Sequence, residues 1–477
     1  METAGIVAEY NPFHNGHAWQ LKELKKQLGD VSVVACMSGA FVQRGEAAIA
    51  SPLVRAEMAI RGGIDLVLEL PVAYSLRSAD YFAAGAVQTL AATGLVTHLV
   101  CGIENPVTED IFPEQNSTSG PGQEPQSKTD EGSRQEPQPG SKQGLKLNQA
   151  QEQGPDTNFP KPRLPFAPPL PETAKWSLTA EAESRVHLFT QAGFSYAAAW
   201  EKAAEAWQNG ASFWFSSPNN ILALAYQKAI LQHSKKMQLH LLPRQGSGYK
   251  QEVLTPPYAS AAAIRQALSE ATVFPGRQPF EKRGLQTELA QVLPATTLSL
   301  LEKPEVYPRL FSRQENILTL LLTYCLFDTG SRQLFEHSSA GLDLCHRFYK
   351  TRETLDRGYR YFCRQVANKR DSLPMVQRLA LQLLLRRPRG FWLQPPPPSY
   401  IRVLAFNDRG RQLLKKMKET ATLPTIIKLS DSLRSRELAD DQLLQTDLAA
   451  ADLYQLLSGN TGMYGTALRS SPFYLVQ

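Results

Sequence analysis

The sequence has little cysteine, and its five cysteines lack the spacing of a disulfide framework or a zinc site. They lie far apart, are odd in number and include no CxxC pair: Cys36, Cys101, Cys325, Cys345 and Cys363. Proteins of the reducing cytosol typically use cysteine in this way. We therefore expect a cytoplasmic protein without structural disulfides or zinc.

Long hydrophobic runs are also missing. No apolar stretch approaches the ~20 residues that span a bilayer, and the start of the chain, with GIVAEYNPF, has no basic n-region or long apolar h-region. We expect neither secretion nor membrane insertion. The excess of positive charge is small, with Lys+Arg 51 against Asp+Glu 45. It permits a polyanionic partner without requiring one, and a solvated surface explains it equally well.

What the sequence does contain is a repeated alternation of strand-like and helix-like segments. Apolar β-type runs at Gly5–Tyr10, Val31–Met37, Asp65–Leu70 and Thr97–Glu104 are separated by segments with helical patterning. Such alternation predicts an α/β fold with a parallel sheet and right-handed crossovers. Because these runs are almost entirely apolar, both faces of the sheet should be covered.

At 477 residues the chain is long enough for two or more domains. Residues 105–175 are dominated by Pro, Gln, Gly, Ser and Lys, which predicts a disordered low-complexity insertion. Residues 1–104 and 176–273 would then form one interrupted Rossmann-like domain. Residues 274–477 are mostly helical in pattern and more basic, apart from extended segments such as Tyr400–Phe406, and are expected to form a mainly α-helical carboxyl-terminal domain.

The motif HNGH lies directly after the first predicted strand. A helix that begins there offers free backbone N–H groups and a partial positive charge at the carboxyl edge of the sheet, which is a natural phosphate site. His14 and His17 flank Gly16, and both imidazoles can donate hydrogen bonds to phosphate oxygens. One large class of nucleotidyl transferases holds ATP with HxGH in this setting. The alternative is that the two histidines are ordinary turn and cap residues.

Other residues fall where a nucleotide site would need them, although each has an ordinary structural explanation. Gly102 can let a base or ribose approach the backbone, or be a simple strand-end glycine. Asn219 and Asn220 can face adenine or ribose, or cap a helix. Arg244 and Arg265 can neutralise triphosphate charge, or be solvated surface residues.

The segment from Met37 to Ala59 is rich in small residues and follows the second predicted strand. Ser38, Gln43, Arg44 and Glu46 are candidates for the lining of an acceptor pocket, with Ser51 and Arg55 as its support. The alternative is a loop followed by a capped helix. Asp65 and Asp80 are further candidates for cation or nucleotide contacts.

Taken together, several motifs resemble the bacterial tRNA(Met) cytidine acetate ligase family. The resemblance covers most of the chain outside the predicted insertion and rests on GIVAEYNPFHNGH, MSGAFVQRGEAAIASPLVRAEMAI, GIDLVLELP, SADYFAAGAV, SPNNILALAY and YIRVLAFNDRGRQLLKKMK. It implies an HxGH nucleotidyltransferase-like fold. It also implies an enzyme that joins ATP and acetate into acetyl-adenylate and then transfers the acetyl group to N4 of the wobble cytidine of elongator tRNA(Met), giving N4-acetylcytidine.

The resemblance also implies which residues bind ATP. They are Val7, Ala8, Glu9, Tyr10, Asn11, Pro12, Phe13, His14, Asn15, Gly16, His17, Ala18, Trp19 and Gln20, together with Gly102, Asn219, Arg244 and Gln245. Two departures stand out. The family usually has Ile where this chain has Gln245, and it tends to show SATSIR where this chain has SAAAIR, so that Ala262 and Ala263 remove two hydroxyls that can hold phosphate.

Such a reaction asks little of side-chain chemistry. Acetate is already ionised near pH 7, so its attack on the α-phosphate needs positioning and charge stabilisation more than a general base, and His14 and His17 suit that role. Mg²⁺ is expected to bind the phosphates, although no compact cluster of carboxylate residues in the sequence indicates its protein ligands. The basic carboxyl-terminal domain, residues 274–477, would then bind the tRNA, and its Tyr359, Tyr361 and Phe362 can stack on RNA bases or belong to a core.

Two other functions remain open from the sequence. HxGH alone also fits an adenylyltransferase that acts on a small cofactor precursor, although such an enzyme has no need of a large basic helical half. The two alanines of SAAAIR are compatible with a tRNA-binding protein that has lost its chemistry, against which stand the intact His14, Gly16 and His17.

Overall fold

The computed structural model describes residues 2–104, 167–244, 253–271, 284–303, 306, 311–327, 329–433, 436–459 and 465–476. Most of the predicted insertion, Gln245 and the predicted boundary between residues 273 and 274 lie outside these ranges. Residues 1–106 and 167–477 form one compact unit.

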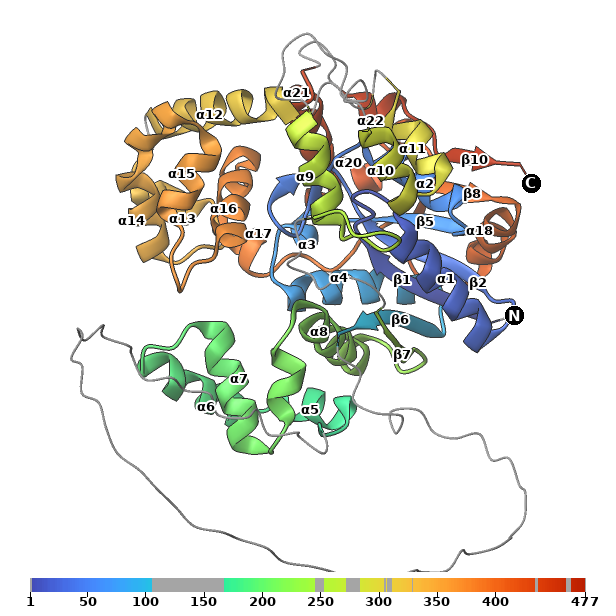
Figure 1. Cartoon of the computed structure of the whole chain (residues 1–477), viewed down its shortest axis with the longest axis horizontal. Coiled ribbons are helices and arrows are strands. Elements are labelled where there is room, and N and C mark those ends of the chain that lie inside the picture. Colours follow the sequence, from blue (N-terminus) through green and yellow to red (C-terminus); the bar gives the residue numbers. More distant parts are fainter. Residues whose placement is uncertain are drawn as a thin grey trace, which may run out of the picture. The chain divides into compact units, whose positions relative to one another are not determined.

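The centre of this unit is an eight-stranded, mostly parallel sheet (Figure 1). Its strand order is β10-β8-β5-β2-β1-β6-β7, and β9 also pairs with β8. The strands are β1 (Thr3–Ala8), β2 (Ser32–Ser38), β5 (Leu66–Leu70), β6 (His98–Ile103), β7 (Gln238–Pro243), β8 (Ile401–Asn407), β9 (Thr425–Ile426) and β10 (Phe473–Leu475). The predicted α/β fold with a parallel sheet is therefore confirmed, with one antiparallel exception at β8.

Strand β1 lies inside the sheet, between β2 and β6. Ile6 lies opposite Ala35 of β2 and Val100 of β6. All residues of β2 and β5 are buried, as expected for strands that are covered on both faces. Parallel strands bring their carboxyl ends to one edge, so the residues that follow β1, β2 and β6 meet there.

Helices cover the sheet and supply its crossovers. The first group, up to α9, is α1 (Asn15–Leu28), α2 (Pro52–Arg61), α3 (Val72–Ser75), α4 (Ala79–Ala92), α5 (Leu170–Ser177), α6 (Ala180–Gln191), α7 (Tyr196–Trp207), the 3₁₀ helix η1 (Ala211–Phe215), α8 (Pro218–His233) and α9 (Ala261–Ala271). Helices α4 and α8 pack against each other. A hairpin of β3 (Phe41–Val42) and β4 (Glu46–Ala47) follows β2.

The later part of the chain is mainly helical, as predicted. Its helices are α10 (Leu285–Val292), α11 (Ala295–Leu301), α12 (Phe311–Phe327), α13 (Ser331–Glu336), α14 (Leu342–Lys350), η3 (Arg352–Arg357), α15 (Tyr359–Val366), α16 (Leu373–Leu385), α17 (Arg389–Leu393), α18 (Asp408–Thr420), α19 (Leu429–Ser432), α20 (Arg436–Ala439), α21 (Gln442–Leu457) and α22 (Thr466–Arg469). Helices α12 to α17 gather to one side of the sheet in Figure 1.

Two predicted boundaries need correction. Residues 274–477 are not separate from the sheet, because β8 pairs with β5 in antiparallel fashion and carries β9 and β10 with it. The predicted insertion also extends too far at its carboxyl end, since α5 begins at Leu170. Leu170, Thr173 and Ala174 of α5 are buried, so these residues form ordered structure despite the prolines beside them.

Two findings concern the cysteines and the longer helices. All five cysteines are free thiols. No helix in the described ranges is both long and apolar enough to cross a membrane.

Candidate functional site

The two histidines of the motif lie at the start of α1, where they cap the helix and each other. His14 is the N-cap residue, and its Nδ1 accepts a hydrogen bond from the backbone N–H of Gly16 at 3.0 Å. The backbone N–H of His14 in turn donates to Nδ1 of His17 at 3.2 Å. The two rings stack with centroids 3.8 Å apart. This is a capping box built from two imidazoles, which fixes both rings relative to the helix end.

These hydrogen bonds determine the tautomer of both rings, and burial keeps both rings neutral. Because each Nδ1 accepts a hydrogen bond, each neutral imidazole carries its proton on Nε2. Burial, with the cations of Arg244 and Arg265 nearby, lowers the pKa of His14 to about 3. Burial and the neighbouring His14 hold the pKa of His17 well below its usual range. The pair therefore offers two neutral N–H donors at a positively polarised helix start.

Gly16 leaves room for the ring of His14. A Cβ at this position would lie 2.8 Å from Cε1 and 3.0 Å from Nδ1 of His14. Glycine is needed here because the His14 ring folds back over the helix start.

Behind the histidines, buried polar side chains hold the loop that follows β1. The Arg55 guanidinium is fully buried and donates to the carbonyl oxygens of Glu9, Ser38, Gly39 and Ala50. Asn11 Oδ1 accepts from the backbone N–H of Ile49 at 2.7 Å. Arg55 thus joins the loops after β1 and β2. The Ser51 side chain caps α2.

Residues at the ends of β6 and β7 form the opposite side of the site. The Glu104 carboxylate accepts a 2.7 Å hydrogen bond from Asn219 Nδ2 and lies 3.4 Å from Arg244 Nη1. Gly102 leaves room for the Arg244 side chain, since a Cβ would lie 3.1 Å from its Cγ. Asn220 is buried and ties α8 to the end of β6 by accepting from the backbone N–H of Glu104. Neither asparagine is the N-cap of α8, which is Ser217.

The start of α9 closes the site from a third direction. Arg265 Nη1 donates to the carbonyl oxygen of Asn11 at 2.9 Å, and Ser260 Oγ accepts from the backbone N–H of Ala263. Of the two alanines that depart from the family pattern, Ala262 lines the cavity whereas Ala263 is fully buried. Only the hydroxyl missing at position 262 would face a ligand.

These elements enclose a cavity of about 270 Å³ at the carboxyl edge of the sheet. The predicted ATP-binding residues that line it are Val7, Ala8, Glu9, Tyr10, Asn11, His14, Gly16, His17, Trp19, Gln20, Gly102, Asn219 and Arg244, joined by Arg265. Among the described residues, Pro12, Phe13, Asn15 and Ala18 were predicted to bind ATP but do not line it. Phe13 is in the core, and Asn15 Nδ2 donates to the carbonyl oxygens of Pro257 and Gln291.

The predicted acceptor pocket is only partly reproduced. Gln43 and Arg44 line the cavity, but Ser38 is fully buried and does not line it. Glu46 lies beside Arg265, with Oε2 3.9 Å from Nη2. Asp65 lies at the amino-terminal end of β5, on the opposite edge of the sheet, where it accepts hydrogen bonds from Val33 and Asn407. Asp80 pairs with Lys228 at 2.7 Å. Neither aspartate belongs to the site.

Several lining residues were not anticipated. They form the less polar wall of the cavity and are Phe82, Val100, Cys101, Leu222, Tyr226, Leu242 and Tyr258. Burial raises the pKa of the Cys101 thiol to about 12, so it is an inert neutral group. Nothing in the sequence marks these residues individually, although three of them lie on β6 and β7, next to positions that were predicted.

Two neutral histidines lie at a helix start and face arginines across the edge of a parallel sheet. This arrangement is typical of the nucleotide site of nucleotidyl transferases. A sequence model of the family described as HIGH Nucleotidyl Transferase matches residues 1–137 and 169–465.

Proteins of similar sequence indicate which family within this class the chain belongs to. A tRNA(Met) cytidine acetate ligase from Fervidobacterium nodosum is 30% identical over 486 residues, covering 96% of both chains. One from Latilactobacillus sakei is 31% identical and covers 90% of this chain and 88% of its own. Within the HIGH nucleotidyl transferases, the chain therefore belongs to the tRNA(Met) cytidine acetate ligase family and is an ATP-dependent ligase.

Solved structures show the same fold. A crystal structure of Thermotoga maritima TmcAL bound with alpha-thio ATP superposes with a TM-score of 0.75 at 23% identity, and an apo form of that protein with a TM-score of 0.77 at 24% identity. Both comparisons cover 100% of each chain.

Proposed function

We propose that this enzyme activates acetate with ATP and acetylates N4 of the wobble cytidine of elongator tRNA(Met). The observation that carries the proposal is the histidine pair at the start of α1. Its two rings are held by backbone hydrogen bonds through Nδ1, so their Nε2–H groups are available for phosphate oxygens. The names of the relatives support the choice of acyl group and RNA.

In the first step, a carboxylate oxygen of acetate attacks the α-phosphorus of ATP. The new bond gives acetyl-adenylate, and the bond from the α-phosphorus to the bridging oxygen breaks, so pyrophosphate leaves. His14 and His17 donate to oxygens that gain charge in the transition state, while Arg244 and Arg265 offset the charge of the triphosphate. Because these groups are preorganised in a largely buried site, their stabilisation is stronger than it would be in water.

In the second step, the exocyclic amine of cytidine attacks the acetyl carbonyl and AMP leaves with the bonding electron pair. The amine loses one proton during this exchange. A wobble base in an anticodon loop can be presented without opening a duplex, which reduces the energy needed to reach the cavity. Gln43 and Arg44 line the cavity beside the loop after β2, and we assign them to the acceptor side.

Mg²⁺ is proposed to enter with ATP as part of the substrate. No group of three His, Cys, Asp or Glu side chains in the described part of the chain is arranged to hold a metal ion. Glu9 lines the cavity and already has a protein partner, since it accepts from the backbone N–H of Gln43. Glu104, at the end of β6, accepts from Asn219. Magnesium that is held mainly by phosphates and water is common in nucleotide sites.

The first test is to incubate the protein with ATP, Mg²⁺, labelled acetate and total bacterial tRNA, and then to analyse the nucleosides. We expect label in N4-acetylcytidine of elongator tRNA(Met). Pyrophosphate release without label in RNA, but with label in another acceptor, would favour the adenylyltransferase alternative. The absence of any ATP turnover, under conditions in which a relative is active, would favour the RNA-binding alternative.

The role of His17 gives a sharper test. His17→Ala removes a donor to the phosphates but no RNA contact, so we expect acetate-dependent ATP–pyrophosphate exchange to fall by roughly 100-fold or more while tRNA affinity changes little. Parallel losses of exchange and tRNA affinity would instead indicate a structural histidine.

A further inference from the structure

We propose that a groove between α18 and the β8–β9–β10 edge of the sheet is a second RNA-binding surface, which holds phosphates and stacks an unpaired base away from the catalytic cavity. This proposal rests on the RNA substrate proposed above. It concerns a surface that shares no lining residue with the catalytic cavity.

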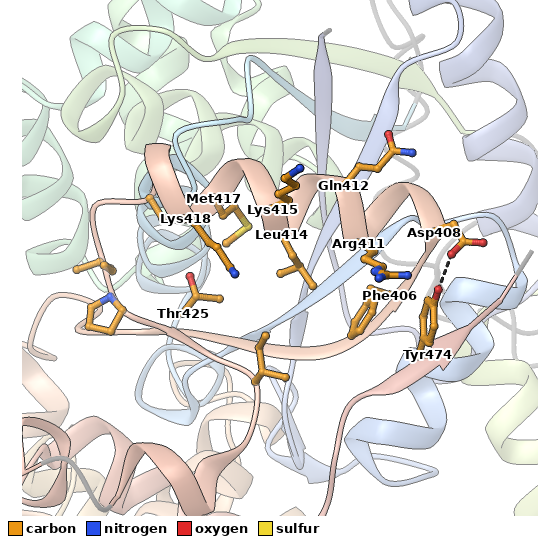
Figure 2. A pocket seen from close by; sticks show the side chains of 14 residues that line it. Phe406, Asp408, Arg411, Gln412, Leu414, Lys415, Met417, Lys418, Thr425 and Tyr474 are labelled. Atoms are coloured by element: carbon orange, nitrogen blue, oxygen red, sulfur yellow. Dashed lines mark hydrogen bonds between the residues drawn. The ribbon is translucent and has the colours of Figure 1, made fainter.

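The groove has a volume of about 1090 Å³ and is larger than the cavity beside the histidines (Figure 2). One wall is α18, and the other is formed by the segment that leads into β9 and by Tyr474 of β10. Phe406 of β8 lies between them. Because β8 is antiparallel to β5, Phe406 pairs with Leu66 at the amino-terminal end of β5. The groove therefore reaches the edge of the sheet opposite to the histidines.

Its charge is predominantly positive. Arg411, Lys415 and Lys418 line the groove at positions i, i+4 and i+7 of α18, which share one helix face. All three are exposed, and none forms an ion pair with another described residue. By contrast, Arg409 at the start of the same helix pairs with Asp30 at 2.8 Å. The acidic side chain of the lining is Asp408, which accepts a hydrogen bond from the Tyr474 hydroxyl.

An aromatic platform lies at one end of this basic face. Tyr474 stacks on Phe406 with ring centroids 4.9 Å apart and an interplanar angle of 27°. Tyr474 remains 36% exposed and lines the groove, so part of its surface is accessible there. Figure 2 shows the Arg411 side chain reaching down beside these rings, and the Lys418 side chain reaching toward Thr425 at the other end.

This combination favours RNA over an acidic peptide. A row of cations beside an exposed ring matches the repeating phosphates and the bases of an unpaired strand. An acidic peptide would use the cations but leave the ring and the apolar surface of Leu414, Pro424 and Ile427 without a matched partner.

The test is direct binding of a dye-labelled elongator tRNA(Met) transcript, followed by fluorescence anisotropy over a range of salt concentrations and without ATP. The triple variant Arg411→Ala, Lys415→Ala, Lys418→Ala should bind at least roughly tenfold more weakly at 0.1 M salt. Its slope of log affinity against log salt should fall by about 2 to 3, because each lost phosphate contact removes about 0.7 to 0.9.

A matched control is available on the same helix. Lys416 is exposed and adjacent to Lys415 but does not line the groove. Lys416→Ala should bind RNA like the wild type, whereas Lys418→Ala alone should lower the salt slope. Tyr474→Leu should weaken binding several-fold at every salt concentration without changing the slope, and Tyr474→Phe, which keeps the ring, should restore that part of the affinity.

The outcomes are distinct from those of the catalytic proposal, because binding needs no chemistry. Urea unfolding of each variant checks the fold. Unchanged RNA affinity of the folded triple variant, or an equal loss in Lys418→Ala and Lys416→Ala, would overturn the groove proposal. So would binding of poly-glutamate that is lost in the triple variant while RNA binding persists, since the groove would then serve an acidic peptide. Acetylation that fails while these RNA effects appear would overturn only the catalytic proposal.

Discussion

At the scale of single residues, the histidine pair couples the fold to pH. His14 is neutral when folded, with its pKa lowered to about 3 by burial, Arg244 and Arg265, whereas an unfolded histidine titrates near 6.5. The unfolded chain therefore binds more protons at acidic pH. Above about pH 6.5 the free energy of unfolding is not reduced by this difference in pKa. As the pH falls from 6.5 toward 3, the free energy of unfolding decreases, because the unfolded chain takes up the proton.

The substitution His14→Asn tests this coupling. Asparagine is a favourable N-cap residue and can accept the hydrogen bond from Gly16, but it does not titrate. Between pH 8 and pH 5 the wild type should lose about 2 kcal/mol more unfolding free energy than the variant, because 1.5 pH units below 6.5 correspond to about that energy. Urea unfolding of the ligand-free proteins at both pH values measures it. An identical pH dependence would show that His14 is not held neutral.

The same residues show what sequence can and cannot predict about a site. The spacing of His14 and His17 after a strand predicts a phosphate site, because strand and helix start are both visible locally. The role of Gly16 could not be predicted, since it depends on how the His14 ring folds back. Cys101 and Tyr226 reach the cavity only through the register of β6 and the packing of α8, which no local pattern specifies.

At the scale of elements, the start of α18 anchors the antiparallel strand. Asn407 caps α18 and donates from Nδ2 to Asp65 Oδ1 at 3.0 Å. A Cβ on Gly410 would lie 1.9 Å from the carbonyl oxygen of Asp65. Because the contacting atom of Asp65 belongs to the backbone, a Cβ on Gly410 could be accommodated only if β5 or α18 moved.

We therefore expect Gly410→Ala to lower the free energy of unfolding by about 3 kcal/mol. Gly390→Ala is the control, because Gly390 lies in α17 and a Cβ there would meet nothing within 4 Å. That variant should be within about 1 kcal/mol of the wild type, on the stabilising side. Urea denaturation at neutral pH compares them, and equal effects would contradict the close packing of α18 on β5.

Strands were predictable where their sequences are apolar and long. β1, β2, β5, β6 and β8 lie within two or three residues of the predicted runs. β7 was missed because its first half is only partly buried and therefore lacks a continuous apolar pattern. The antiparallel direction of β8 could not be inferred, since the partner of a strand is set by tertiary packing rather than by the strand itself.

At the scale of the whole molecule, we expect that catalysis does not require the segment between β6 and α5. Residues 107–166 lie outside the described ranges, and their sequence, dominated by Pro, Gln, Gly, Ser and Lys, contains no plausible core or ligand set. We predict that replacing them with a short flexible linker leaves acetate-dependent ATP–pyrophosphate exchange and tRNA acetylation within about twofold of the wild type. The comparison requires equal amounts of folded protein, judged by urea unfolding. A folded deletion variant with little turnover would refute the prediction.

The pairing of β5 with β8 also has a consequence during translation. β5 ends at Leu70, but the strand that covers its outer edge ends at Asn407. At 5 to 20 residues per second the ribosome needs roughly 17 to 67 s to make the intervening chain. Throughout that time the five residues of β5, four of them apolar, present an unpaired edge, which is a template for wrong pairing with other nascent chains. Because β8 is synthesised long after β5, we expect the nascent chain to bind a chaperone that covers exposed strand edges.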